Sequence, residues 1–78
     1  MDFVELDRKL QSRRRLPSPA VARAIREDAG LAQDDLARAL GVTRAAVSRW
    51  ESGERYPRTE NLARYLELLD HLRGQMAA

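Results

Sequence analysis

Cysteine is absent from this 78-residue chain, and it holds only four glycines, three prolines and four aromatic residues (one Trp, two Tyr and one Phe). Without cysteine there is no disulfide scaffold, no thiol nucleophile and no zinc site that uses sulfur. No apolar run approaches the roughly 18 residues of a membrane span, and residues 1–5 lack signal-peptide character. From these absences we expect neither a disulfide-stapled secreted domain nor a membrane protein, but a cytoplasmic one.

Charges of both signs are plentiful and nearly balanced, with a net charge of +2 at pH 7. Charged residues make up 33% of the chain and hydrophobic residues 44%, an ordinary mixture for one small core. Lys9 is the only lysine among 14 basic residues. Arginine suits phosphate groups and guanine edges because its planar fork donates paired hydrogen bonds. A GC-rich genome also enriches arginine without functional cause, so composition alone leaves both explanations open.

The length fits a single domain, and apolar residues recur at helical spacing. Helices are predicted over about 3–11, from 19 to a stop at Gly30, over 33–40, from a cap at Thr43 to about 51 or 52, and over about 59–73. No run alternates as a strand would. We divide the chain into an N-terminal amphipathic helix with an arginine-rich segment (1–16), a helical domain (17–74) and a short tail (75–78).

Within residues 33–53, two predicted helices are joined by a three-residue turn that begins at Gly41. On the second helix, Val47 and Trp50 lie on one side at 100° per residue. The opposite side carries two arginines with small residues between them: Arg44, Ala45, Ser48 and Arg49. An α-helix fits the major groove of B-DNA, and arginine pairs with guanine O6 and N7. The small residues would let the backbone approach closely, so this face suits duplex DNA.

Several residues across the stretch 26–69 fall at a characteristic spacing: Gly30, Leu31, Gln33, Leu36, Ala37, Leu40, Gly41, Val42, Val47, Ser48, Glu51, Gly53 and Pro57. In these residues the chain resembles the Cro/repressor-type (XRE-like) helix-turn-helix family, DNA-binding domains of phages and bacteria. The resemblance implies an all-α, lambda-repressor-like fold, a compact bundle of about five short helices with a helix-turn-helix in residues 17–74. It also implies binding of double-stranded DNA with no cofactor, metal or membrane.

The resemblance further implies roles for individual residues. Base edges are expected to be contacted by Thr43, Arg44, Ala45, Ser48 and Arg49. Phosphates are expected to be contacted by Gln33, Arg55, Tyr56 and Arg58. In the family, a pair matching Arg26 and Glu51 braces the recognition helix. One departure is Ala32, which stands where the family often has a serine or threonine that caps the first motif helix, a cap typically worth about 1 kcal/mol.

Two other groups of residues each keep two interpretations. The segment after the first helix is a DNA arm on the backbone or minor groove, or an ordinary solvated helix end: Arg13, Arg14 and Arg15. The last helix has a wider apolar arc than one small core needs. Its outer half either receives the N-terminal helix or forms an interface with another subunit or protein: Tyr65, Leu68 and Leu72.

These features predict a sequence-specific transcriptional regulator, most simply a repressor, in the bacterial cytoplasm or a phage-infected host. If the chain forms a homodimer, its operator should be an inverted repeat with half-sites about one helical turn apart. The alternative is an antitoxin-like module that binds a protein through the last helix and autoregulates its own operon. An enzyme is not expected, because no nucleophile–base pair, metal-ligand cluster or phosphate-cradling glycine loop can be assembled from the sequence.

Overall fold

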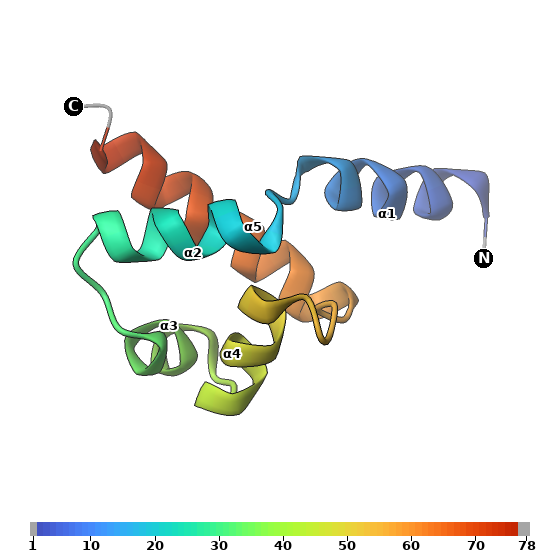
Figure 1. The fold of residues 1–78 in the computed structure, drawn as a ribbon. Helices are drawn as coiled ribbons and strands as arrows, with labels where there is room; N and C mark the ends of the chain where they lie inside the picture. Colours follow the sequence, from blue (N-terminus) through green and yellow to red (C-terminus); the bar gives the residue numbers. More distant parts are fainter. Residues whose placement is uncertain (1, 77–78) are drawn as a thin grey trace.

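Five helices account for most of the chain in the structure, a computed structural model that describes residues 2–76 apart from the side chains at 9, 12–14, 75 and 76. They are α1 (Phe3–Arg15), α2 (Pro19–Asp28), α3 (Gln33–Leu40), α4 (Arg44–Ser52) and α5 (Thr59–Met76). No strand occurs between residues 2 and 76. The predicted all-α fold of about five helices is confirmed. Helices α2 to α5 form the body, here called the bundle, and α1 projects from it (Figure 1).

Local signals explain where the helices of the bundle begin and end. The hydroxyl of Ser18 accepts a hydrogen bond from the amide of Val21, and Pro19 occupies the first turn of α2, where its missing N–H carries no penalty. Helix α3 ends at Gly41, whose φ of 69° is a left-handed conformation that glycine adopts without strain. Both boundaries agree with the sequence prediction.

Two helices are longer than the sequence predicted. Helix α1 continues through the expected linker to Arg15 and stops directly before Leu16, the residue that Pro17 disfavours in the helical conformation. Helix α5 passes through Gly74, the predicted stop, and reaches Met76. Gly74 does not have a positive φ, so nothing at that position forces the helix to end. The predicted tail therefore begins inside α5, and residues 77–78 lie outside the described part.

The core lies between the four helices of the bundle. Its most deeply buried large side chains come from three of them: Leu36, Val47, Tyr65 and Leu69. The rings of Trp50 and Tyr65 are in contact, with centroids 4.9 Å apart and planes inclined by 42°. Trp50 is therefore part of the core, where its large apolar surface anchors α4 against α5.

The apolar arc of α5 is covered mainly by the chain itself. Tyr65 and Leu72 are buried in the core, and Leu68 is half-buried and packs against it. Of the two interpretations of this arc, packing within the chain fits the burial of Tyr65 and Leu72 better than an interface with another subunit. Helix α1 does pack on α5, and Arg15 forms an ion pair with Asp70 at 2.7 Å.

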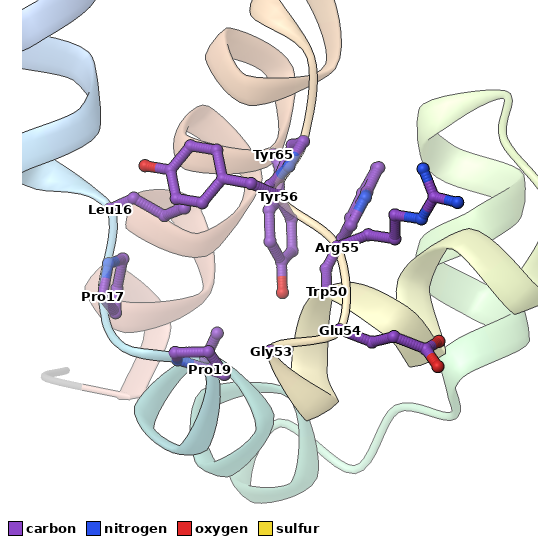
Figure 2. A pocket seen from close by; sticks show the side chains of 11 residues that line it. Leu16, Pro17, Pro19, Trp50, Gly53, Glu54, Arg55, Tyr56 and Tyr65 are labelled. Carbon is purple, nitrogen blue, oxygen red and sulfur yellow. The ribbon is translucent and has the colours of Figure 1, made fainter.

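A cavity of about 340 Å³ separates the linker before α2 from the loop after α4 (Figure 2). Leu16, Pro17 and Pro19 line one side, and the loop from Gly53 to Pro57 lines the other. Tyr65 reaches the cavity from α5, and its buried hydroxyl has no hydrogen-bond partner within the part of the chain that is described. Burial raises the pKa of Tyr65 to about 12, because the charged phenolate would be poorly solvated there.

Candidate nucleic-acid interface

Helix α4 presents two chemically different sides. Val47, Trp50 and Glu51 are buried against the bundle. The predicted base-contacting residues are all exposed: Thr43, Arg44, Ala45, Ser48 and Arg49. The bundle therefore fixes the inner side of α4 and leaves the outer side accessible along its whole length.

The start of α4 is fixed by a side-chain cap. Thr43 has an extended backbone, and its hydroxyl oxygen accepts a hydrogen bond from the amide of Ala46 at 3.1 Å. This bond satisfies one of the amides that a helix start leaves without an internal partner. The Thr43 hydroxyl can still donate its own proton outward, so capping α4 does not prevent Thr43 from contacting a ligand.

A buried network connects α2, α3 and α4 beneath the exposed side of α4. Arg26 donates two hydrogen bonds to the Glu51 carboxylate, from Nε at 2.7 Å and Nη2 at 2.9 Å. Its third nitrogen donates to the carbonyl of Leu31 at 2.7 Å. The side-chain amide of Gln33 donates to the same carboxylate at 3.1 Å. Glu51 thus holds groups from both neighbouring helices.

The charges in this network balance each other. The Arg26 and Glu51 side chains are only 10% and 2% exposed, so each would be costly to bury alone. The hydrogen bonds from Arg26 to Glu51 raise the pKa of Arg26, and this effect exceeds the opposing effect of burial. The pair is bidentate, a geometry that fixes orientation as well as separation. The network therefore sets the position of α4 relative to α2 and α3.

A polar hollow lies at the start of α3, beside the exposed end of α4. It is lined by Arg23, Arg26, Ala32, Gln33, Asp34 and Arg44. Arg44 therefore lies near Gln33, although the two belong to different helices. Arg23 was not singled out from the sequence, because its position beside Arg44 depends on how α2 packs against α4.

The start of α3 lacks a side-chain cap, because Ala32 has no side-chain oxygen. Asp35 partly compensates by accepting a hydrogen bond from the Ala32 amide at 2.7 Å.

Arg49 carries an exposed partner. Its Nε lies 3.4 Å from the carboxylate of Glu54, and both side chains are more than half exposed. Exposed ion pairs contribute about 0–1 kcal/mol, so a stronger anion or a base edge can displace Glu54. No sequence pattern indicated this contact, because Glu54 lies beyond the glycine that ends α4.

In the loop after α4, the residues predicted to contact phosphate extend their side chains to different sides of the loop. Arg55, Tyr56 and Arg58 are all exposed. In Figure 2 the Tyr56 ring is directed toward Leu16, whereas Arg55 extends from the opposite side of the loop. The structure therefore does not bring Tyr56 and Arg55 together on one surface, although they are adjacent in sequence.

The predicted arginine arm is only partly described. The side chains of Arg13 and Arg14 lie outside the described residues, and Arg15 is paired with Asp70 of α5.

Arg64 is a residue that the sequence analysis missed. Its guanidinium donates hydrogen bonds to the carbonyls of Leu40 at 2.9 Å and Ala39 at 3.1 Å. Arg64, on α5, thereby supplies hydrogen-bond partners for carbonyls that the end of α3 leaves without a partner inside the helix.

Comparison with known families agrees with this geometry. A family model described as helix-turn-helix matches residues 23–73, which span α2 to α5 almost completely. The comparisons with curated proteins and with solved structures gave no match. None of the helices in residues 2–76 has the length and apolarity that a membrane crossing requires. The chain belongs to the helix-turn-helix family of Cro/repressor (XRE) type, whose members are DNA-binding transcription regulators.

Proposed function

We propose that this DNA-binding regulator recognises a specific operator and acts as a repressor of phage or bacterial type, by occluding a promoter. The observation that carries the proposal is the buried Arg26–Glu51–Gln33 network under α4. It holds α4 in one orientation, with Arg44 and Arg49 on the exposed side. A rigid helix with two outward arginines suits base readout in a major groove. The site of action is the bacterial cytoplasm or a phage-infected host, where promoter DNA is found.

In this proposal, base readout and phosphate binding are divided between different residues. Arg44 and Arg49 read bases, with Thr43, Ala45 and Ser48 allowing close approach of α4. Gln33 binds phosphate with its remaining amide N–H, while Arg55 and Arg58 bind the backbone beyond α4. Phosphate contacts supply salt-dependent affinity, and base contacts supply sequence preference. Glu51 is tolerated close to phosphates because its charge is already matched by Arg26.

Tyr56 has a separate place in the proposal. Its ring is directed toward Leu16 (Figure 2), so any phosphate it binds lies on the α1 side of the loop. Arg13 and Arg14 directly precede Arg15 in the chain, and Arg15 forms an ion pair with Asp70 of α5. A minor-groove or backbone arm at this position would extend the contact beyond the recognition helix.

Selection of bound fragments from random duplex DNA tests the proposal directly. We expect an enriched motif, which is an inverted repeat if two copies bind, with half-sites about one helical turn apart. Binding to that motif should weaken steeply as salt rises. Equal affinity for the selected sequence and for random duplex would contradict a specific regulator.

Three variants separate the proposed roles on the selected DNA. Arg49→Ala should relax the preference at one or two base pairs, each worth about 1–3 kcal/mol. Arg58→Ala should weaken binding to all sequences alike and reduce the salt slope by about 1. Arg73→Ala is the matched control, since it removes one exposed arginine from the far end of α5. Equal loss in all three variants would reduce the interaction to general charge attraction.

The antitoxin-like alternative was motivated by the apolar arc of the last helix. Since Tyr65 and Leu72 are buried inside the bundle, the surface suggested for a protein partner is largely occupied by the chain itself. Copurification of a neighbouring gene's product through α5 would reinstate that alternative. The operator-binding proposal is therefore the one that the described contacts favour.

A further inference from the structure

The cavity between the linker and the loop after α4 has the size and lining of a small-molecule site. Its volume of about 340 Å³ falls within the roughly 300–1,000 Å³ of ligand pockets. Two buried aromatic rings, those of Trp50 and Tyr65, belong to its lining. Pro17, Pro19 and Pro57 add rigid apolar surface to the walls. Small-molecule sites are lined in this way, mostly by apolar and aromatic side chains with a few polar groups.

The hydroxyl of Tyr65 is a polar group that this cavity leaves without a partner. Tyr65 is 1% exposed, and its oxygen forms no hydrogen bond with any described residue. Figure 2 shows the hydroxyl directed into the space between the linker and the loop. Folded proteins pair nearly all of their buried polar groups, so a ligand that brings a hydrogen-bond acceptor would complete this wall. Since the pKa of Tyr65 is raised to about 12, the hydroxyl keeps its proton at neutral pH and can donate it.

The charged side chains of the loop do not enter the cavity. Glu54 and Arg55 are part of the lining, but in Figure 2 both extend away from Leu16 and Pro17, toward the far side of the loop. An ionised ligand would therefore have no opposite charge beside it inside the cavity, and burying it would be costly. The ligand that matches this lining is uncharged.

We propose that the cavity binds a small, uncharged, planar aromatic molecule that accepts one hydrogen bond from the Tyr65 hydroxyl. Its rings pack against Trp50 and the prolines of the linker and loop. Such binding needs no DNA, so it does not depend on the operator recognition proposed above.

Binding in the cavity is coupled to the position of the loop. The Tyr65 hydroxyl is fully buried, so a ligand atom reaches it only when one wall of the cavity moves outward. Residues 54–56 are exposed, whereas Leu16 in the linker is half-buried, so the loop has less packing to lose. The same loop carries Arg55 and leads into Arg58, the residues proposed to bind phosphate. A ligand that favours the displaced loop therefore weakens DNA binding.

Titration of the full chain with quinoline, without DNA, tests the site. Quinoline is bicyclic, uncharged at neutral pH, and has one acceptor nitrogen. We expect saturable changes in the amide NMR shifts of Gly53 and Tyr56, with a Kd of about 0.1–1 mM. N-methylquinolinium has the same rings with a permanent charge and no acceptor, and it should not bind. The absence of shifts around the cavity at millimolar quinoline, or equal binding of the two probes, overturns the proposal.

Three variants locate the probe. Tyr65→Phe should weaken quinoline binding about three- to tenfold by removing one hydrogen bond. Leu16→Trp should abolish binding by filling the cavity. Leu10→Trp is the matched control, because it adds the same side chain at an exposed position on α1 outside the cavity.

Unchanged affinity for quinoline in either cavity variant contradicts the proposal. In Tyr65→Phe it would mean that the hydroxyl is not the partner of the ligand. In Leu16→Trp it would mean that quinoline binds elsewhere on the chain. The amide spectrum of each variant shows whether the bundle is intact, and Tyr65→Phe keeps the test decisive if Leu16→Trp does not fold.

A measurement on random-sequence duplex DNA tests the coupling to the loop. Near-saturating quinoline should weaken duplex binding by the wild type about fivefold or more. It should leave Leu16→Trp unaffected, which excludes an action of quinoline on the DNA itself. Unchanged duplex affinity of the quinoline-bound wild type would overturn the coupling. Arg44→Ala should bind quinoline as the wild type does, so a failure of base readout by α4 is distinguishable from a failure of this site.

Discussion

The bundle and α1 distribute charge and apolar surface in opposite ways. In the bundle, Arg26 and Glu51 are buried beneath the exposed side of α4, the proposed recognition helix, and the large apolar side chains are packed in the core. In α1, the large apolar side chains face outward, and charges of each sign occupy one half of the helix. The same chain thus contains one region whose large apolar side chains are covered and one whose large apolar side chains are exposed.

The difference shows what each arrangement accomplishes. A buried ion pair adds little net stability, because removing two charges from water offsets most of their attraction. Its bidentate geometry fixes the relative placement of α2 and α4, which is what a recognition helix requires. The apolar side chains of α1 fix no such placement within the chain, because they remain largely exposed.

Breaking the buried pair should have the largest effect on the bundle. Glu51→Ala leaves the Arg26 guanidinium buried without its carboxylate, and we expect a loss of about 3–5 kcal/mol in the free energy of unfolding. Urea denaturation followed by circular dichroism measures it. Glu27→Ala, which breaks the exposed pair with Arg23, is the control and should cost about 0.5 kcal/mol or less. Similar losses in the two variants would mean that the free energy lost on breaking an ion pair does not depend on its burial.

A leucine in each region gives the next largest contrast. Leu69 is fully buried in α5, so Leu69→Ala should cost about 2–5 kcal/mol by removing packed atoms and leaving a cavity. Leu10→Ala in α1 should change stability by about 0.5 kcal/mol or less in dilute protein, because Leu10 is nearly half exposed. Denaturant midpoints at one low protein concentration measure both. A large loss from Leu10→Ala would show that α1 is part of the cooperative core.

The Tyr65 hydroxyl is a weak point inside the bundle. Tyr65→Phe removes a buried oxygen without a described partner, and we expect it to stabilise the fold by about 1–3 kcal/mol. The pKa of Tyr65 is raised to about 12 from an ordinary value of 10. The folded state therefore keeps a proton that the unfolded state releases. That contribution is complete below pH 10 and is lost as pH rises toward 12.

Unfolding measured from pH 9 to 12 checks this prediction. The wild type should lose more stability than Tyr65→Phe as pH rises from 10 toward 12, whereas the difference in stability between the two proteins should stay constant below pH 10. Destabilisation by Tyr65→Phe at neutral pH would instead indicate that the hydroxyl has a partner that holds it in the fold.

Matching helix caps give the smallest effects. Thr43→Ala removes the cap of α4 and should lower the free energy of unfolding by about 1 kcal/mol. Asp2 caps α1 by accepting from the Glu5 amide at 2.8 Å, but Asp2→Ala should reduce only the helical signal of α1. Circular dichroism at low temperature reports the helical content, and thermal unfolding reports the bundle. If Asp2→Ala shifts the midpoint of the bundle's thermal unfolding, the stability of the bundle depends on that of α1.

Much of the fold follows from local sequence signals. Apolar spacing, the Ser18 and Thr43 caps and the stop at Gly41 act within a few residues, so the bounds of α3 and α4 were predictable. The exposed face of α4 follows from the 100° period of a helix and the burial of Trp50. The end of α1 was local too, since Pro17 disfavours helix at Leu16, but the extent of the helix up to that residue was not predicted.

Contacts between distant segments were not predictable in this way. Arg64 reaches the end of α3 from a position 24 residues away, and Arg23 lies beside Arg44 only because α2 packs on α4. Arg26 and Glu51 were paired in the sequence analysis through the family resemblance, not through any local pattern. Tyr56 and Arg55 are neighbours in sequence, yet the loop turns them to different sides.

By itself, the sequence determined which segments are helical and which side of α4 is polar, because both depend on interactions within one or two turns. Only the tertiary structure decided that the wide apolar arc of α5 is largely buried within the bundle and that the apolar side of α1 remains exposed. An amphipathic pattern predicts that a helix face will be buried, but it does not indicate which element will cover that face. That choice depends on the angles at which whole helices pack, and those angles are set by contacts far apart along the chain.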